Sequence, residues 1–276
     1  MNRTLLAAAV LTAWPLPAEA RPGPAAAQPL PADPLKSPMW EFVADLAFGK
    51  GAVVRFDPRV KVAFPAIAEN QRVFPVQVDA RGIADVARVV IVIDLNPIQI
   101  PIDYRLGDAE PFVSTRVKLD QRTPVRGAVQ LKDGTWLVSG SWIDAAGGGC
   151  SAPPVSRVKG DWSDRLGEVR GRLWQAAGGG ASASRVQLAF RHPMDTGLVD
   201  NIAVYHIDDL KLTGAGGRAL GEMKMQAAVS EDPVITVMPR TRAGEAVAFA
   251  GRDTNGVEFR GSVPTGAAEQ ARGSGN

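Results

Sequence analysis

Two series of short alternating segments constrain the fold of this chain more than any other feature. Apolar and polar residues alternate within each segment, turn residues separate the segments, and no helical periodicity lies between them. Short strands at this spacing are typical of antiparallel β-sandwiches. The first series predicts strands over residues 60–64, 73–78, 88–95, 112–119, 123–131 and 135–143. The second series predicts strands over residues 168–175, 184–191, 202–207, 210–213, 221–228, 234–239, 245–253 and 257–263.

One helix is expected before the first series. Ser37 is a typical N-cap, Pro38 suits the first helical position, and apolar residues then recur at three- and four-residue spacing up to a stop signal at Gly49. We expect a short amphipathic helix over about residues 38–48 that closes one end of a domain. The predicted fold class is therefore all-β, with two β-sandwich domains in tandem and one short N-terminal helix.

The first twenty residues have the pattern of a secretory signal peptide. Arg3 supplies a positive start, residues 5–16 form an apolar stretch too short to span a bilayer, and Ala18-Glu19-Ala20 offers a cleavage site. A buried N-terminal helix is the alternative, and it is disfavoured because Pro15 and Pro17 would break it. We therefore expect an exported mature chain.

Composition and the positions of turn-forming residues divide the chain into six segments. Proline and alanine dominate the stretch after the signal, which predicts a disordered leader, and small polar residues dominate the end. The predicted segments are a signal peptide (1–20), a disordered leader (21–36), a first β-sandwich (37–146), a Gly/Pro linker that contains Cys150 (147–166), a second β-sandwich (167–264) and a disordered tail (265–276).

Charge and hydropathy exclude two classes of function. The net charge is +2 and both signs are interspersed, so we expect no nucleic-acid partner. No run after the signal approaches the roughly 20 apolar residues of a membrane helix, so we expect no membrane insertion.

Cys150 is the single cysteine among 276 residues, and it follows Gly147, Gly148 and Gly149. Three glycines make a poor core element, whereas free cysteines are usually buried in apolar runs. A single cysteine cannot form an internal disulfide, so in an exported protein the thiol is free, pairs with another chain or holds a ligand. We interpret Cys150 as a functional thiol on a flexible arm. A homodimer linked through Cys150 and a thiol without any role are the alternatives.

The reactivity of such a thiol depends on its pKa. The thiolate is the reactive form, and the unperturbed pKa lies near 8.5. Arg157 and Lys159 would lower the pKa if they fold next to the thiol, and a partner enzyme could supply the same activation.

His192 and His206 are the two histidines of the chain, and neither belongs to a recognisable metal or catalytic constellation. Two histidines on separate strands without a third ligand make a weak metal site. The run Arg191-His192-Pro193-Met194 instead predicts a strand end in a turn that fixes the contact between the two units. We therefore expect no metal site and no catalytic role for these histidines.

Four motifs resemble those of a known pair of proteins. In the first unit they are Phe64-Pro65-Ala66-Ile67-Ala68-Glu69-Asn70, Val113-Ser114-Thr115-Arg116-Val117-Lys118-Leu119 and Gly147-Gly148-Gly149-Cys150. In the second unit the motif is Arg191-His192-Pro193-Met194-Asp195-Thr196-Gly197. Together they resemble the sulfur carriers SoxY and SoxZ of bacterial thiosulfate oxidation, joined here in one polypeptide. More narrowly, the chain is similar to the fused SoxYZ-like carriers associated with quinoprotein dehydrogenases.

The resemblance implies immunoglobulin-like sandwiches for both halves, a periplasmic location and a carrier without catalysis or cofactor. It implies that Cys150 holds sulfur intermediates covalently, and that Gly147, Gly148 and Gly149 give the arm its flexibility. The implied partners are periplasmic oxidoreductases, either c-type cytochrome sulfur-oxidising enzymes or a quinoprotein dehydrogenase. SoxY has its carrier cysteine at the extreme C-terminus, whereas here the chain continues, so the arm is anchored at both ends. The alternative function is a non-catalytic docking or accessory subunit of a periplasmic quinoprotein dehydrogenase, with Cys150 incidental or redox-sensing.

Overall fold

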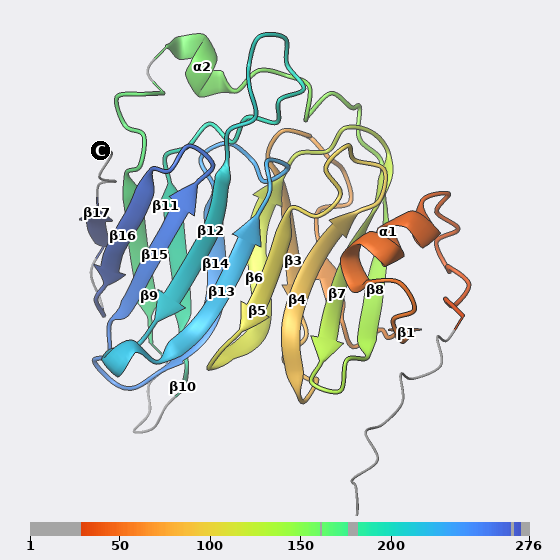
Figure 1. Cartoon of the computed structure of the whole chain (residues 1–276), viewed down its shortest axis with the longest axis horizontal. Coiled ribbons are helices and arrows are strands. Elements are labelled where there is room, and N and C mark those ends of the chain that lie inside the picture. Colours follow the sequence, from red (N-terminus) through yellow and green to blue (C-terminus); the bar gives the residue numbers. More distant parts are fainter. Residues whose placement is uncertain (1–28, 161, 176–181, 266–267, 272–276) are drawn as a thin grey trace, which may run out of the picture.

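The structure, a computed structural model, describes residues 29–160, 162–175, 182–265 and 268–271. Two β-sheets pack face to face along the whole length of the molecule (Figure 1). The named strands pair in antiparallel fashion, except that β1 and β8 are parallel. The predicted all-β class with immunoglobulin-like sandwich units in tandem is confirmed.

Each sheet contains strands from both halves of the chain. Within the described residues the first sheet has nine strands, in the order β1 (Val54–Phe56), β8 (Trp136–Ile143), β7 (Thr123–Leu131), β4 (Val86–Ile93), β5 (Ile102–Leu106), β13 (Ala219–Met225), β12 (Ile207–Thr213), β15 (Val247–Asp253) and β16 (Glu258–Val263). The second sheet, over the same residues, has the order β17 (Ala268–Ala271), β9 (Val169–Trp174), β11 (Arg185–Phe190), β14 (Val234–Thr241), β6 (Ala109–Val117), β3 (Phe74–Asp79) and β2 (Lys61–Ala63), with β10 (Ser182–Ala183) paired to β14.

The two halves are joined by strand pairing in both sheets. β5 pairs with β13 in one sheet, and β6 pairs with β14 in the other. A free edge strand exposes unpaired N–H and C=O groups. Here the inner edge strands of the two halves pair with each other, so these groups form hydrogen bonds across the junction. The sandwich units are therefore fused side by side, which the sequence pattern did not predict.

One hydrophobic core runs between the sheets through both halves. Tyr104 of β5 and Met223 of β13 are paired across the junction, and each is at most 1% exposed. Gly221 makes room for this packing, because a Cβ added there would lie 2.5 Å from the Tyr104 ring. Removal of such apolar surface from water is the main stabilising term of a sandwich.

A second core lies beneath α1 (Trp40–Phe48), on the outer face of the nine-stranded sheet. Trp40 and Val43 pack there against Val92 and Trp136, and Figure 1 shows the helix over β7 and β8. The predicted N-terminal helix is confirmed. The short elements α2 (Val155–Lys159) and η1 (Ala215–Gly217) were not predicted. None of the described helices has the length and apolarity needed to cross a membrane.

Residues 29–36 correct part of the predicted disordered leader, because they are held against the first sandwich. Asp33 accepts two hydrogen bonds from Arg126, at 2.9 and 2.7 Å, and Arg126 also binds Asp94. Trp142 donates its indole N–H to the Leu35 carbonyl at 2.8 Å. Arg126 is 1% exposed, so its buried charge requires these carboxylates. The rest of that leader lies outside the described residues.

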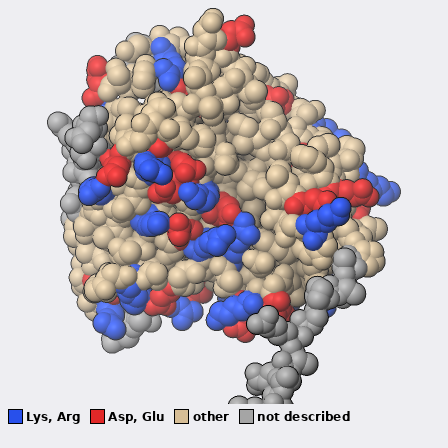
Figure 2. All heavy atoms as spheres, in the orientation of Figure 1, with Lys and Arg blue, Asp and Glu red and all other residues tan. Residues whose placement is uncertain are grey.

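Some strand predictions also differ from the structure. β1 and β5 were not expected, and most of the segment 202–207 is an irregular connection before β12. The tail was expected to lack structure, yet Ala268–Ala271 forms β17 and pairs with β9. The polar face of the nine-stranded sheet has interspersed charges, as predicted, and Figure 2 shows acidic and basic side chains next to one another there.

Candidate functional site

Cys150 lies in the segment that leaves β8, residues 144–154, which we call the thiol arm. The arm folds back onto the chain that follows β6, where the Gly149 N–H donates to the Leu119 carbonyl at 3.0 Å. On its other side, the Gln71 amide donates to the Gly147 carbonyl at 2.8 Å. Cys150 is 1% exposed. The sequence predicted a thiol on a flexible strip, and the structure shows the arm in a docked conformation.

The glycines of the arm allow this close approach. Gly147 and Gly148 have φ values of 98° and 76°, a region that side chains disfavour. A Cβ on Gly149 would lie 2.4 Å from the carbonyl oxygens of Gln71 and Leu119. The glycines thus have a role in docking the arm, and their contribution to flexibility stays a prediction.

Cys150 is held from both halves of the molecule. Its N–H donates to a carboxylate oxygen of Asp120 at 3.3 Å, and its thiol faces the Lys118 carbonyl at 4.0 Å. From the second half, the Thr196 hydroxyl donates to the Cys150 carbonyl at 2.6 Å. The thiol therefore lies at the junction of the two halves, in the segment that connects β8 to α2 (Figure 1).

Lys118 places a buried ammonium group at this junction. Its residue is 5% exposed, and its Nζ donates to the carbonyls of Met194 and, at 2.9 Å, Ala227. Both acceptors belong to the second half. Burial lowers the pKa of Lys118 to about 8. Nearby negative groups favour the charged form of the side chain and partly oppose this shift. Lys118 thus ties the two halves together beside the thiol.

The electrostatic surroundings keep the docked thiol protonated. Burial raises the pKa of Cys150 to about 12, the Asp120 carboxylate adds to the rise, and the Lys118 ammonium opposes it. Because the thiolate is the nucleophile, a docked Cys150 is unreactive near neutral pH. A disulfide to a second chain, the alternative role considered for Cys150, would likewise require the arm to leave its site.

The run from Arg191 to Gly197 forms the second half's side of the site. It follows the end of β11 at Phe190 and turns at Met194, whose φ is 51°. Its contacts to Cys150 and Lys118 come from Thr196 and the Met194 carbonyl. The prediction that this run ends a strand in a turn and fixes the contact between the two units is confirmed.

The two histidines lie in a buried polar cluster rather than at an open site. His192 Nδ1 accepts the Met194 N–H at 3.0 Å, and its Nε2 lies 3.5 Å from an Asp253 oxygen that also accepts the Tyr205 hydroxyl. Burial lowers the pKa of both His192 and His206. Among the described residues, no group of three potential ligands is arranged to hold a metal ion.

The structure does not place Arg157, one of the two cations considered for activation of the thiol, next to Cys150. Arg157 donates to the buried Asp195 carboxylate at 2.7 Å and stacks over Trp162, 4.1 Å from the ring centre. The Lys159 side chain lies outside the described part of the structure. The residues that do surround the thiol, Lys118, Asp120 and Thr196, were not singled out from the sequence. The one available signal was that Lys118 and Thr196 belong to the motifs that carry the family resemblance.

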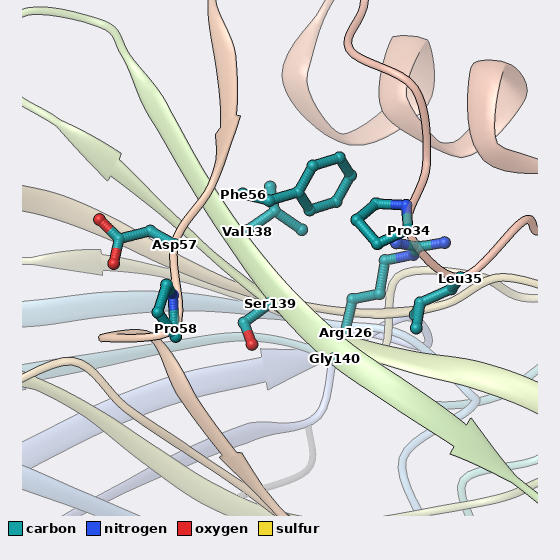
Figure 3. A pocket seen from close by; sticks show the side chains of 9 residues that line it. All are labelled: Pro34, Leu35, Phe56, Asp57, Pro58, Arg126, Val138, Ser139 and Gly140. Atoms are coloured by element: carbon teal, nitrogen blue, oxygen red, sulfur yellow. The ribbon is translucent and has the colours of Figure 1, made fainter.

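A hollow of about 220 Å³ beneath residues 34 and 35 is a weaker candidate for a binding site. Figure 3 shows Phe56 and Pro34 on either side of it, with Arg126 at its base. Two buried aspartates already neutralise this arginine. The hollow therefore offers an apolar wall and a satisfied charge, which suits the packing of the N-terminal segment.

Comparisons with known proteins match two families in succession. A family model described as sulfur oxidation protein SoxY matches residues 44–150, and one described as sulphur oxidation protein SoxZ matches residues 175–264. A search of curated proteins finds no match.

Two solved structures show weak likeness to the chain. The sulfur carrier protein SoxY from Chlorobium limicola f thiosulfatophilum is 20% identical, with a TM-score of 0.35 over 38% of this chain and 94% of its own. The secreted serine protease VesC from Vibrio cholerae is 10% identical, with a TM-score of 0.17 over 79% of this chain and 49% of its own. TM-scores this low support no argument about this chain.

Proposed function

Residues 44–150 belong to the SoxY family and residues 175–264 to the SoxZ family, so the chain is a fused sulfur oxidation carrier, and we propose that Cys150 carries the sulfur covalently. One observation supports this assignment above the others. The SoxY match ends at Cys150, which is the single cysteine of the chain and follows three glycines. A covalent sulfur carrier needs one accessible thiol, and this sequence offers one residue for that role.

Loading requires a thiolate and a sulfur electrophile. With tetrathionate as the donor, the Cys150 thiolate attacks a central sulfur, a new S–S bond forms to an S–SO₃⁻ group, and thiosulfate leaves with the electron pair of the broken S–S bond. The proton of the thiol goes to solvent. The docked state opposes this step, because its thiol is buried and its pKa is about 12.

The carrier therefore works by release of the thiol arm. Residues 144–154 join β8 to α2, so a released Cys150 moves on a loop with two anchors. It lies five residues before Val155, which limits its reach from the start of α2 to about 18 Å at about 3.5 Å per residue. Partner enzymes must accept a loop of this length.

Sulfur-oxidation proteins are the partners that the two families imply. Export by the predicted signal peptide, residues 1–20, would place carrier and partners in the periplasm, and that segment lies outside the described residues. In this proposal the chain has no catalytic centre of its own, and c-type cytochrome or quinoprotein oxidoreductases would perform the chemistry.

The proposal is tested by loading the purified full chain with tetrathionate and mapping peptides without reduction. We expect one S₂O₃ group in exchange for one proton on the peptide that contains Cys150, and its removal by a reductant. Cys150→Ser is the matched control and should gain no mass. A chain that tetrathionate cannot load even after partial unfolding, or a pathway that keeps full activity with Cys150→Ser, would favour an accessory docking subunit instead.

A further inference from the structure

A cleft of about 270 Å³ opens on the outer face of the eight-stranded sheet, opposite the face seen in Figure 2. Arg116 of β6 and Arg170 of β9 are both exposed and both line it. Between them the floor is made of the small side chains of Val234 and Ala189. Cys150 does not line the cleft, although Arg191 belongs both to the cleft and to the run that forms the second half's side of the thiol site.

Strand register places part of the cleft lining in one row. Ala189 pairs with Val234 on one side and with Arg170 on the other, and paired residues point to the same face of a sheet. The ladder between β14 and β6 ends at Thr236 and Ser114, and the Arg116 carbonyl then accepts the Ser230 N–H at 2.9 Å. Arg116 therefore lines the cleft from the point where the chain before β14 leaves the ladder.

The neighbouring row on the same face has no such hollow. There Gln187 fills the centre and donates to the Thr236 hydroxyl at 3.3 Å. At the end of that row, Arg172 stacks over the Trp174 ring, 5.3 Å from its centre. The hollow is therefore a property of the row that contains Ala189 and Val234, which are smaller than the polar residues of the neighbouring row.

The charges around the cleft leave a cationic surplus. Its lining contains three arginines, Arg116, Arg170 and Arg191, and two carboxylates, Glu168 and Asp232. Arg165 already binds Glu168 at 2.9 Å, and Arg191 binds Asp232. Within the part of the chain that the structure describes, Arg116 and Arg170 have no acidic partner. Two guanidinium groups that line the hollow therefore have no acidic partner among the described side chains.

We infer that this cleft binds a small tetrahedral oxyanion of the sulfate or thiosulfate class between Arg116 and Arg170. Guanidinium groups present parallel N–H donors that match the oxygen spacing of such anions, and the bonds are charge-assisted. The small floor residues leave the space between the two guanidinium groups open to an anion. The inference does not rest on the proposed function, because it concerns reversible binding on a face that lacks the thiol.

The test is calorimetric titration of the full chain in a Cys150→Ser background, so that covalent loading cannot contribute. Sodium sulfate and sodium thiosulfate are compared with sodium chloride at constant ionic strength, which keeps general screening unchanged. We expect one saturable site for the two divalent anions. Arg116→Gln and Arg170→Gln should each weaken it about tenfold or more, the effect of one lost charge-assisted pair.

Arg172→Gln is the matched control, since Arg172 lies on the same strand and the same face as Arg170 but outside the cleft. It should leave the affinity unchanged, and circular dichroism in chloride checks the fold of every variant. Arginine side-chain Nε–H NMR signals give a second readout, and those of Arg116 and Arg170 should shift on titration. Glutarate, a dicarboxylate, is titrated for comparison. Three results would each overturn the inference: equal affinity in all three variants, saturation by chloride alone, or tighter binding of glutarate than of sulfate. The last result would indicate a site for a protein carboxylate.

Discussion

Thr196→Val should release the thiol arm without unfolding the chain. The Thr196 hydroxyl donates to the Cys150 carbonyl at 2.6 Å and accepts the Leu198 N–H at 3.2 Å. Valine keeps the shape of threonine and removes the hydroxyl, so both bonds are lost. The first of them joins the second half of the chain to the arm, and its loss acts on the docked state in particular.

The size of the effect follows from these two bonds. A buried hydrogen bond contributes about 1 kcal/mol net, and leaving its partner unsatisfied adds to the cost, so docking should weaken by about 1–2 kcal/mol. A change of this size alters an equilibrium by roughly 5- to 30-fold. The population of the released arm should rise by that factor.

The assay is the rate of iodoacetamide labelling of Cys150 at pH 8. Burial raises the pKa of the docked thiol to about 12, so its thiolate is scarce at pH 8 and labelling proceeds through the released arm. Labelling of wild type should therefore be much slower than in denaturant, and Thr196→Val should be about 5- to 30-fold faster than wild type. Thr213→Val, far from the arm, is the control. An unchanged rate in Thr196→Val, or a wild-type rate equal to that of the unfolded chain, would refute the reasoning.

Three further predictions concern the arm, the junction and the N-terminal segment. Gly149→Ala places a Cβ 2.4 Å from two carbonyl oxygens and should prevent the arm from docking. Cys150 should then label nearly as fast as in the unfolded chain, while the melting temperature changes little. Continued protection of Cys150 from labelling would contradict the docking geometry. The folded pKa of Lys118 is lowered from 10.5 to about 8, so the unfolded chain binds more protons there and stability should rise from pH 8 to 9; in Lys118→Met, thermal melts should show no such rise. Above pH 9 the raised pKa of Cys150 acts in the opposite sense, because the folded thiol keeps a proton that the unfolded chain loses. The stability of Lys118→Met should therefore fall there, whereas that of wild type should change little until the unfolded lysine also loses its proton near pH 10.5. Arg126→Met leaves two buried carboxylates without a cation and should cost about 3–5 kcal/mol in chemical denaturation, whereas a loss below about 1 kcal/mol would show that the N-terminal segment is not held this way.

Local sequence patterns predicted most strands because alternation is a local property. The predicted strand over residues 123–131 has the bounds of β7, and the predicted strand over 135–143 differs from β8 by one residue. β5 was missed although Ile102, Tyr104 and Leu106 alternate with polar residues. Its pairing with β13 depends on register between segments more than a hundred residues apart. Alternation contains no information on that partner, so the fusion of the two sandwiches could not be predicted.

The same limit applies to the candidate site. Three glycines before a lone cysteine singled out Cys150 as the candidate thiol, but composition predicted an exposed arm rather than the buried one in the structure. Its burial depends on Gln71, Asp120 and Thr196, which lie far from it in the sequence. Arg126 in the middle of a buried strand indicated a charged partner in principle. Nothing local identified Asp33 in the leader as that partner.

The central claim is that sulfur is carried on Cys150, and the most direct test is the mass of that residue in protein isolated from cells that oxidise sulfur compounds. The protein is purified without reductant, digested at acidic pH to prevent thiol exchange, and the peptide containing Cys150 is measured before and after reduction. We predict sulfur or thiosulfonate adducts on Cys150 that disappear on reduction, and none elsewhere in the chain. A peptide that contains only free thiol during active sulfur oxidation would contradict the account.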